Sequence, residues 1–192
     1  MKLTARFQDA LVYAAQLHKD QLRKGTDVPY ISHLLAVTSL VLENGGNEDE
    51  AIAALLHDAI EDQGGATTRE EIRQRFGDAV VAIVDGCSDT DVMPKPPWQE
   101  RKEAYIERMR NAPASVRLVS MADKLHNARA ILADYREVGE SLWERFNGGK
   151  EGTLWYFRSL VKVFAEQDRG PLVKELRRVV SEIEKLATQN PV

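Results

Sequence analysis

Apolar residues recur along most of the chain at spacings of three and four, the period of an amphipathic helix, whereas alternating strand-like runs are nearly absent. Near the start, Phe7, Leu11, Ala14 and His18 share one face and predict a helix over residues 4–19. The same period predicts further helices over residues 29–44, 48–61, 68–76, 78–84, 99–110, 116–132, 151–166 and 172–186. This pattern predicts an all-α fold, a helical bundle of about eight to ten helices.

Capping and breaking residues set several of the expected boundaries. Pro29 can open a helix, because backbone N–H groups in the first turn have no intrahelical acceptor and proline, which lacks an N–H, loses no hydrogen bond there. Thr68, with Glu71 three residues later, matches a capping box and predicts a helix that starts at Thr68. Residues 88–98 hold three prolines among acidic residues, so we expect a surface loop that is long enough to move or to border a pocket.

The composition is that of an ordinary globular chain, and it narrows the classes of partner. Its 192 residues, 43% hydrophobic and 29% charged, predict a single domain over residues 1–192. The net charge of -4 gives no general attraction to nucleic acid or to acidic membranes. Cys87 is the single cysteine, which excludes an intrachain disulfide and favours a reducing, cytoplasmic location. The charged N-terminal segment lacks the apolar core of a signal peptide, and no apolar run approaches a membrane span. The oligomeric state is left open.

The stretch ALLHDAIED, residues 54–62, places ionisable side chains in an otherwise apolar helical run. Residues three and four apart share a face of a helix, so we expect His57 to stand over Glu61 and Asp58 to lie over both Glu61 and Asp62. Burying such groups without partners is costly, so their convergence on one face calls for a ligand or a catalytic role. The alternative is an exposed helix end with ordinary charges.

Two further polar residues lie in segments whose periodicity predicts burial, namely His33 and Asp123. Each could be a satisfied core residue. Together with His57 and Asp58, however, they offer two imidazoles and two carboxylates from three successive long helices. Such a donor set suits a divalent ion such as Mn²⁺, Fe²⁺ or Zn²⁺, and it leaves coordination positions for water and substrate.

Three blocks carry a resemblance to a known family: HKDQLRKGTDVPYISH, LLHDAIED and MADKLHNAR, spread between His18 and Arg129. In this order they resemble the HD-domain phosphohydrolases, and in particular the hydrolase domain of Rel/SpoT-type alarmone enzymes. We expect no synthetase domain in the remaining length, and the chain is then similar to the stand-alone small alarmone hydrolases. The resemblance implies Mn²⁺-dependent removal of pyrophosphate from guanosine 3′,5′-bis(diphosphate), with another divalent metal as the alternative.

Position by position, the resemblance implies roles for the residues that match. The implied metal ligands are His33, His57, Asp58 and Asp123. The implied acidic pair beside the activated water, which would accept its proton or orient it, is Glu61 and Asp62. The implied nucleotide contacts are Arg23, Lys24, Asn127 and, by its place in an aromatic run, Tyr156. A solvated basic loop is the alternative for Arg23 and Lys24, and a core aromatic is the alternative for Tyr156.

Some features depart from the family pattern and leave the substrate open. Ala130 stands where some Rel enzymes carry a hydroxyl residue, and the proline-rich segment 88–98 differs from the usual one. Arg101 and Lys102 could supply charge for outer phosphates. The alternatives are hydrolysis of another phosphorylated nucleotide, such as NADPH or a nucleoside monophosphate, and a non-catalytic nucleotide sensor.

Overall fold

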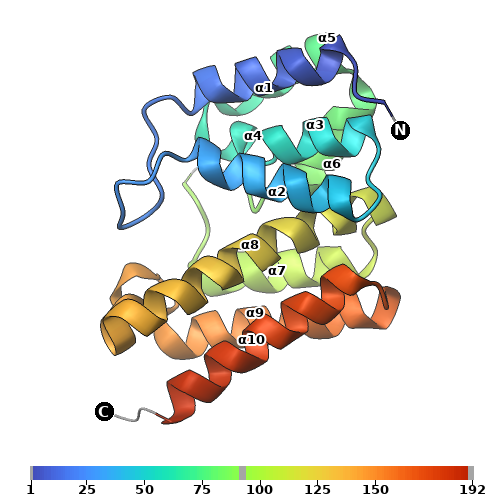
Figure 1. Ribbon diagram of the computed structural model, residues 1–192. Coiled ribbons are helices and arrows are strands. Elements are labelled where there is room, and N and C mark those ends of the chain that lie inside the picture. The colour runs from blue at the N-terminus through green and yellow to red at the C-terminus, as the bar shows by residue number, and fades with distance from the viewer. Residues whose placement is uncertain (1, 91–93, 190–192) are drawn as a thin grey trace. The chain divides into compact units, whose positions relative to one another are not determined.

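A computed structural model of the protein describes residues 2–90 and 94–189 (Figure 1). In these ranges the regular structure is helical, from α1 to α10, and the extended pairing is limited to an isolated bridge between Leu22 and Pro29. The all-α prediction is therefore confirmed. None of the helices in the described ranges is both long and apolar enough to cross a membrane.

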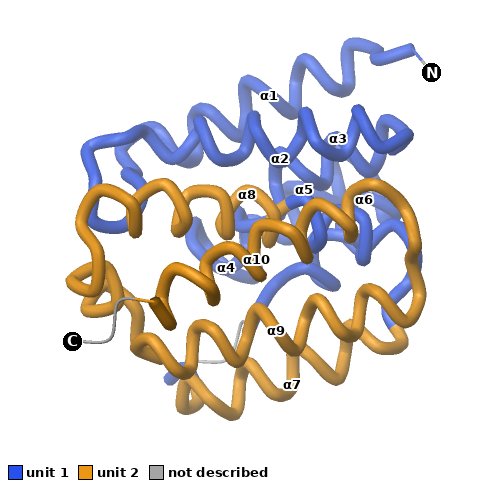
Figure 2. Tube along the Cα trace, turned by 60° about the horizontal axis from the view of Figure 1, so that its bottom comes forward, with its two compact units in different colours: residues 1–95, 112–122 blue, residues 96–111, 123–192 orange. Residues whose placement is uncertain are grey.

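The chain divides into two compact units, which Figure 2 shows in different colours. Unit 1 comprises Met1–Lys95 and Ala112–Ala122, and unit 2 comprises Pro96–Asn111 and Asp123–Val192. The helix α8, Ala114–Val138, contributes its first part to unit 1 and the rest to unit 2. The expectation of one domain over residues 1–192 stays a prediction.

Unit 1 is built around one apolar helix. Its helices are α1 Ala5–Leu17, α2 Ile31–Glu43, α3 Glu48–Leu56, α4 Ala59–Asp62, α5 Gly65–Phe76 and α6 Asp78–Cys87. The helix α3 packs against α1, α2 and α6, and its last six side chains are completely buried. A helix that is apolar all round must lie in a core. On α6, Gly86 lets Val116 of α8 approach so closely that a Cβ at this position would lie 2.6 Å from Val116 Cγ2.

Unit 2 is built around α9, Gly149–Gln167. This helix packs against α7 Trp98–Arg110, α10 Pro171–Gln189 and the 3₁₀ segment η1 Gly139–Arg145. The apolar face of α10 is buried through residues spaced by three and four: Leu172, Val173, Leu176, Val179, Val180, Ile183 and Ala187. The predicted helices over 99–110, 151–166 and 172–186 are thus confirmed within a few residues.

The predicted continuous helix over residues 48–61 is wrong, because the chain breaks at His57 and Asp58. The helix α3 ends at Leu56, and Asp58, with φ -101° and ψ -3°, caps the short helix α4. His57 Nδ1 lies 2.8 Å from the Ala54 carbonyl oxygen, which a regular helix would offer to the N–H of Asp58. The side chain therefore competes with the backbone ladder at this point.

The predicted helix start at Thr68 is also wrong. The helix α5 begins at Gly65, and Thr68 lies buried inside it, with Oγ1 donating to the Gln63 carbonyl at 2.7 Å. Gly64 and Gly65 have φ of +131° and +58°, a conformation that glycine adopts readily, and this turn starts the helix three residues earlier.

Two other boundary predictions have mixed outcomes. The second helix begins at Ile31, because Pro29 pairs with Leu22 in the isolated bridge and Tyr30 is the N-cap. Of the loop expected over 88–98, the described part contains no helix before Trp98, and residues 91–93 lie outside the described residues.

Candidate active site

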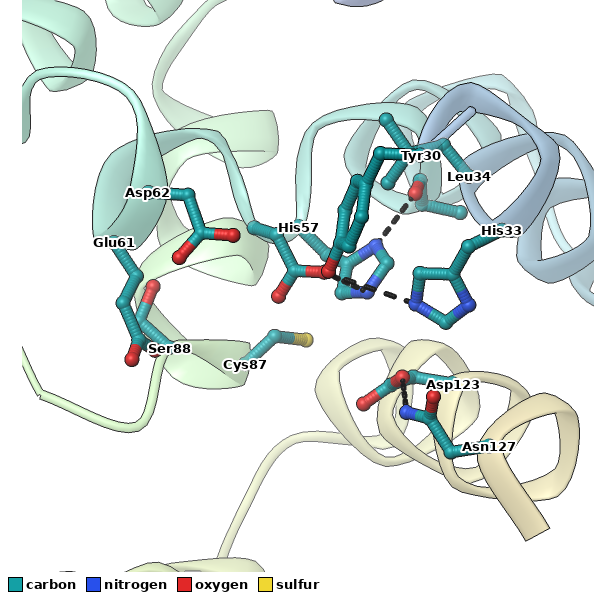
Figure 3. Close-up of polar contacts among 12 residues, drawn as sticks. Tyr30, His33, Leu34, His57, Glu61, Asp62, Cys87, Ser88, Asp123 and Asn127 are labelled. Atoms are coloured by element: carbon teal, nitrogen blue, oxygen red, sulfur yellow. Dashed lines mark hydrogen bonds and ion pairs between the residues drawn. The ribbon is translucent and has the colours of Figure 1, made fainter. Parts of the chain in front are cut away.

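Unit 1 brings three of the expected metal ligands together. His33 comes from α2, and His57 and Asp58 come from the break between α3 and α4. One ligand atom from each residue lies within 4.8 Å of the others, and the two imidazole rings meet at 64° (Figure 3). Both histidines are buried, at 1% and 2% exposure, while the Asp58 side chain is 26% exposed. The two imidazoles are thus enclosed by the protein, while the Asp58 carboxylate is partly accessible to solvent.

The contacts within this group fit a shared cation. His57 Nδ1 faces a carbonyl oxygen, which can only accept, so Nδ1 carries a proton; when the ring is neutral, Nε2 is an acceptor. That Nε2 lies 3.0 Å from Asp58 Oδ2, also an acceptor, and His33 Nε2 lies 3.7 Å from the same oxygen. Ligands about 2.1 Å from one ion lie about 3 to 4 Å apart. A cation between them would turn this repulsion into coordination, and the expected N/O donors suit a divalent one.

Tyr30, which the sequence reasoning did not assign to the site, holds Asp58 in place. Its hydroxyl donates to Asp58 Oδ2 at 2.6 Å, and its ring meets the His33 ring edge-on with 5.5 Å between centroids. The His18 ring stacks on the Tyr30 ring, with 5.3 Å between the two centroids. The signal was present in the block HKDQLRKGTDVPYISH, where Tyr30 lies three residues before His33.

The acidic pair Glu61 and Asp62 lies on α4, directly after the metal group, and Figure 3 shows both side chains. Glu61 accepts a hydrogen bond from the Asp89 backbone N–H at 3.0 Å through Oε2, and it forms a 2.8 Å ion pair with Lys95 through Oε1. Both oxygens of this carboxylate are therefore held by the segment after α6.

Asp62 has a different environment. Its Oδ2 accepts a 2.9 Å hydrogen bond from Gln21 Nε2. Burial, and then the negative charge of Asp58, raises the pKa of the Asp62 carboxyl above its ordinary value, while the Gln21 hydrogen bond opposes this shift. A carboxylate with a raised pKa is a better proton acceptor than one with the ordinary pKa, although Asp62 as a whole residue is still accessible to solvent.

The loop between α1 and α2 places Arg23 beside this site. Arg23 N–H donates to the Val28 carbonyl at 2.8 Å, and Tyr30 N–H donates to the Gln21 carbonyl at 2.8 Å. The Arg23 guanidinium lies over the Tyr30 ring, 5.7 Å from its centroid. Lys24 is exposed on the same loop. Both residues belong to unit 1, and their nucleotide contacts stay predictions.

Asp123, the fourth expected ligand, belongs to unit 2 and is buried. Lys124 Nζ lies 2.6 Å from its Oδ2, and Asn127 Nδ2 donates to its Oδ1 (Figure 3). Although burial by itself lowers the pKa of Lys124, the charge of Asp123 raises that pKa well above its ordinary value. The metal-binding role of Asp123 and the nucleotide contact of Asn127 stay predictions.

Tyr156, the expected aromatic contact, is buried in unit 2 at 6% exposure. Its ring lies 6.4 Å from Trp98 and 6.3 Å from Tyr105, both edge-on. Lys102 Nζ lies 5.0 Å from its centroid. Tyr156 therefore lies in an aromatic core, with the Lys102 ammonium group near its ring. A substrate contact of Tyr156 stays a prediction.

The chain is similar to proteins of a known family. A family model described as HD domain matches residues 10–153. The guanosine-3′,5′-bis(diphosphate) 3′-pyrophosphohydrolase MESH1 of Xenopus tropicalis is 41% identical over 126 residues, 64% of this chain and 68% of the relative. The human protein of that name is 35% identical over 130 residues, 66% of this chain and 70% of the relative.

The fold has a solved counterpart. A structure titled as a metazoan ortholog of SpoT that hydrolyses ppGpp superposes with a TM-score of 0.78 at 24% identity, covering 95% of this chain and 97% of that one. At this identity the likeness shows the fold. With the family match over residues 10–153 and the relatives above, it confirms the resemblance drawn from the three sequence blocks. The chain belongs to the HD domain family, and within it this protein resembles the stand-alone alarmone hydrolases related to Rel/SpoT-type enzymes.

Proposed function

We propose that this protein is a metal-dependent phosphohydrolase that removes pyrophosphate from the 3′ position of guanosine 3′,5′-bis(diphosphate). One observation carries the proposal. The buried donors His33, His57 and Asp58 lie within 4.8 Å of one another, and Glu61 and Asp62 follow on the next short helix. Support also comes from the MESH1 relative of that name, 41% identical over 126 residues.

The metal is assigned to the donors already in place. His33 Nε2, His57 Nε2 and an Asp58 oxygen would hold a divalent cation, with Asp123 proposed as the fourth ligand and Mn²⁺ as the ion. When bound, such a cation lowers the pKa of water and offsets negative charge on phosphoryl oxygens. Tyr30 orients Asp58 for this task through its 2.6 Å hydrogen bond.

The acidic pair is assigned to the water that attacks phosphorus. Asp62 Oδ2 accepts the Gln21 hydrogen bond, so we assign Oδ1 as the atom that takes the proton. Burial, and then the charge of Asp58, raises the pKa of Asp62, which suits it to this step. Glu61, held through both oxygens by Asp89 N–H and Lys95, is assigned to orienting the water.

Substrate binding is assigned to two basic residues for the phosphates and to two uncharged residues for the ribose and base. The Arg23 guanidinium, positioned on the Tyr30 ring, can bind phosphate oxygens in a bidentate manner, and Lys24 adds a point charge. Asn127 and Tyr156 are proposed to contact the ribose and base. The cytoplasmic location expected from the single cysteine is part of the same proposal.

Turnover by purified protein with defined metal content tests the proposal. With Mn²⁺ we expect release of one pyrophosphate per alarmone, loss of activity with EDTA and recovery when Mn²⁺ is restored. A parallel panel with NADPH and nucleoside monophosphates identifies the alternative substrates. Full metal loading with no turnover of the alarmone would contradict the proposal, and alarmone binding without turnover of any substrate would indicate a sensor.

A further inference from the structure

A chain of hydrogen bonds lies behind Asp62, and its central residue is Gln21. Gln21 Nε2 donates to Asp62 Oδ2 at 2.9 Å. On the other side of the amide, Oε1 lies 2.6 Å from Gln63 Nε2 and 2.6 Å from His18 Nδ1. All four residues belong to unit 1. The Gln21 amide is thus held from both ends, although it is 41 residues from Asp62 in the chain.

The partners of Gln21 determine where the protons lie. An ionised carboxylate only accepts, so Gln21 must present its NH₂ group to Asp62 and its carbonyl oxygen to His18. His18 Nδ1 must therefore carry a proton. The other ring nitrogen, Nε2, is buried and has no hydrogen-bond partner among the described residues. A buried polar atom without a partner is costly, so the hydrogen bond of Nδ1 is the polar contact that this ring makes with Gln21 at that cost.

The His18 ring is itself fixed on two sides. His18 is the C-cap of α1 and is 2% exposed. Its ring stacks on Tyr30 with 5.3 Å between centroids and 19° between planes. Tyr30 in turn donates to Asp58. One imidazole therefore supports Asp62 through Gln21 and Asp58 through Tyr30.

We infer that His18 and Gln21 are positioning residues for the hydrolytic reaction: the chain His18 Nδ1–H, Gln21 amide, Asp62 Oδ2 fixes the Asp62 carboxylate so that Oδ1 faces the reacting water. This inference rests on the proposed function. A neutral amide between an imidazole and a carboxylate orients both without taking a proton, so the role is geometric. A displacement of about 1 Å in a proton acceptor costs about 10²-fold in rate.

Gln21→Met removes all three side-chain hydrogen bonds of Gln21, those with Asp62, Gln63 and His18, while keeping the length of the side chain. We expect kcat to fall about 10- to 100-fold with KM within about threefold of the wild type, because the contact acts on the reacting group. Metal content and melting temperature should stay close to those of the wild type. Gln8→Met, at an exposed position on α1, is the matched control and should leave kcat unchanged. Equal kcat in Gln21→Met and wild type would overturn the inference.

Substitutions of His18 separate a positioning role from simple packing. Asn places an N–H donor near the position of Nδ1, whereas Leu has a similar volume and no donor. We expect His18→Asn to keep most of kcat and His18→Leu to match Gln21→Met. The double variant His18→Leu with Gln21→Met should be no slower than Gln21→Met alone, because both changes break one chain. Equal activities of the Asn and Leu variants, or additive losses, would contradict the inference.

The tautomer of His18 provides a readout that needs no turnover. In ¹⁵N-labelled wild type we expect the neutral Nδ1–H form, and in Gln21→Met we expect this preference to be lost. An Nε2–H form in the wild type would overturn the hydrogen-bond chain. A metal-loaded wild type that hydrolyses no alarmone overturns the proposed function and the positioning role with it, whereas an active wild type with unaffected variants overturns the inference alone.

Discussion

Both units carry partly exposed ion pairs, and they differ in the ionisable groups that they bury. Unit 1 buries His18, His33 and His57; the Asp58 carboxylate lies 3.0 Å from His57 Nε2, and Asp62 is linked to His18 through Gln21. Unit 2 carries arginine–glutamate pairs with partly exposed side chains between its helices: Arg129–Glu175, Arg136–Glu182 and Arg158–Glu184. Its interior consists mainly of aromatic and aliphatic side chains. Asp123 with Lys124 is an exception in unit 2, a buried charge that lies beside its own counter-ion.

This difference indicates a division of labour. Exposed ion pairs contribute little to stability, and apolar burial in unit 2 accounts for its cohesion without any ligand. Three buried imidazoles and two facing carboxylates cost stability unless something compensates them. Unit 1 is therefore organised for chemistry at the expense of stability, and unit 2 is organised mainly for packing.

The largest effect is expected at the metal group of unit 1. His57→Ala and Asp58→Ala each remove a donor from the cluster, so metal stoichiometry should fall and turnover should drop about 10⁴-fold, about 5.4 kcal/mol in the barrier. Metal analysis and kinetics check both. Asp78→Asn, whose side chain is 89% exposed, is the control and should change neither. Unchanged metal content in both variants would refute the ligand assignment.

The next effect tests the packing of unit 2. Phe164 on α9 is completely buried, so Phe164→Ala should lower the free energy of unfolding by about 3–5 kcal/mol through lost burial and a cavity. Val138→Ala, at 42% exposure in the same unit, should change it by less than about 0.5 kcal/mol. Urea unfolding measures both. At urea concentrations below its unfolding midpoint, Phe164→Ala should retain metal. Loss of metal from the folded variant would contradict the assignment of unit 2 mainly to packing.

A smaller loss is expected from the acidic pair, with the metal retained. Glu61→Gln and Asp62→Asn keep shape and remove charge, so kcat should fall about 10²- to 10³-fold, about 3–4 kcal/mol. Metal stoichiometry should equal that of the wild type. Glu137→Gln, exposed on α8, controls for the loss of one carboxylate. Full activity in both site variants would remove the pair from the mechanism.

The smallest effect concerns the ion pairs of unit 2. Hydrogen bonds from Arg178, the largest cause, together with one from Arg129, lower the pKa of Glu175 from 4.5 to about 2. A lowered folded-state pKa adds stability above about pH 4.5, and this contribution disappears as the pH falls through about 2. Glu175→Gln should therefore cost below about 1 kcal/mol at pH 7, since solvent screens the pair. The difference from wild type, followed by urea unfolding, should shrink at pH 3; a constant difference would point to packing.

The helices were predictable wherever the apolar period was long. The spacing of three and four in α1, α7, α9 and α10 was sufficient, because one face of each must be buried. The break after Leu56 was not predictable from that period, since the segment on either side is apolar. It depends on a side chain, His57, that takes the Ala54 carbonyl from the backbone.

The candidate site shows the same limit. His33, His57 and Asp58 were recognisable from residue type and from the family blocks, and the structure gathers them within 4.8 Å. Tyr30 and Gln21 were inside a quoted block, but the sequence reasoning assigned neither of them a role. Their contacts with Asp58 and Asp62 span 28 and 41 residues, and such pairs are formed by packing and not by local spacing.

By itself, the sequence determined the fold class and the donor types, because periodicity and residue chemistry are local properties, and three sequence blocks indicated the family by resemblance. The tertiary structure decided which oxygen of Asp58 faces two imidazoles and which oxygen of Asp62 is held by Gln21. It also decided that His57 and Asp58 stand at a break between two helices. These are distances between groups far apart in the chain, and they exist only once α1, α2 and α3 pack together.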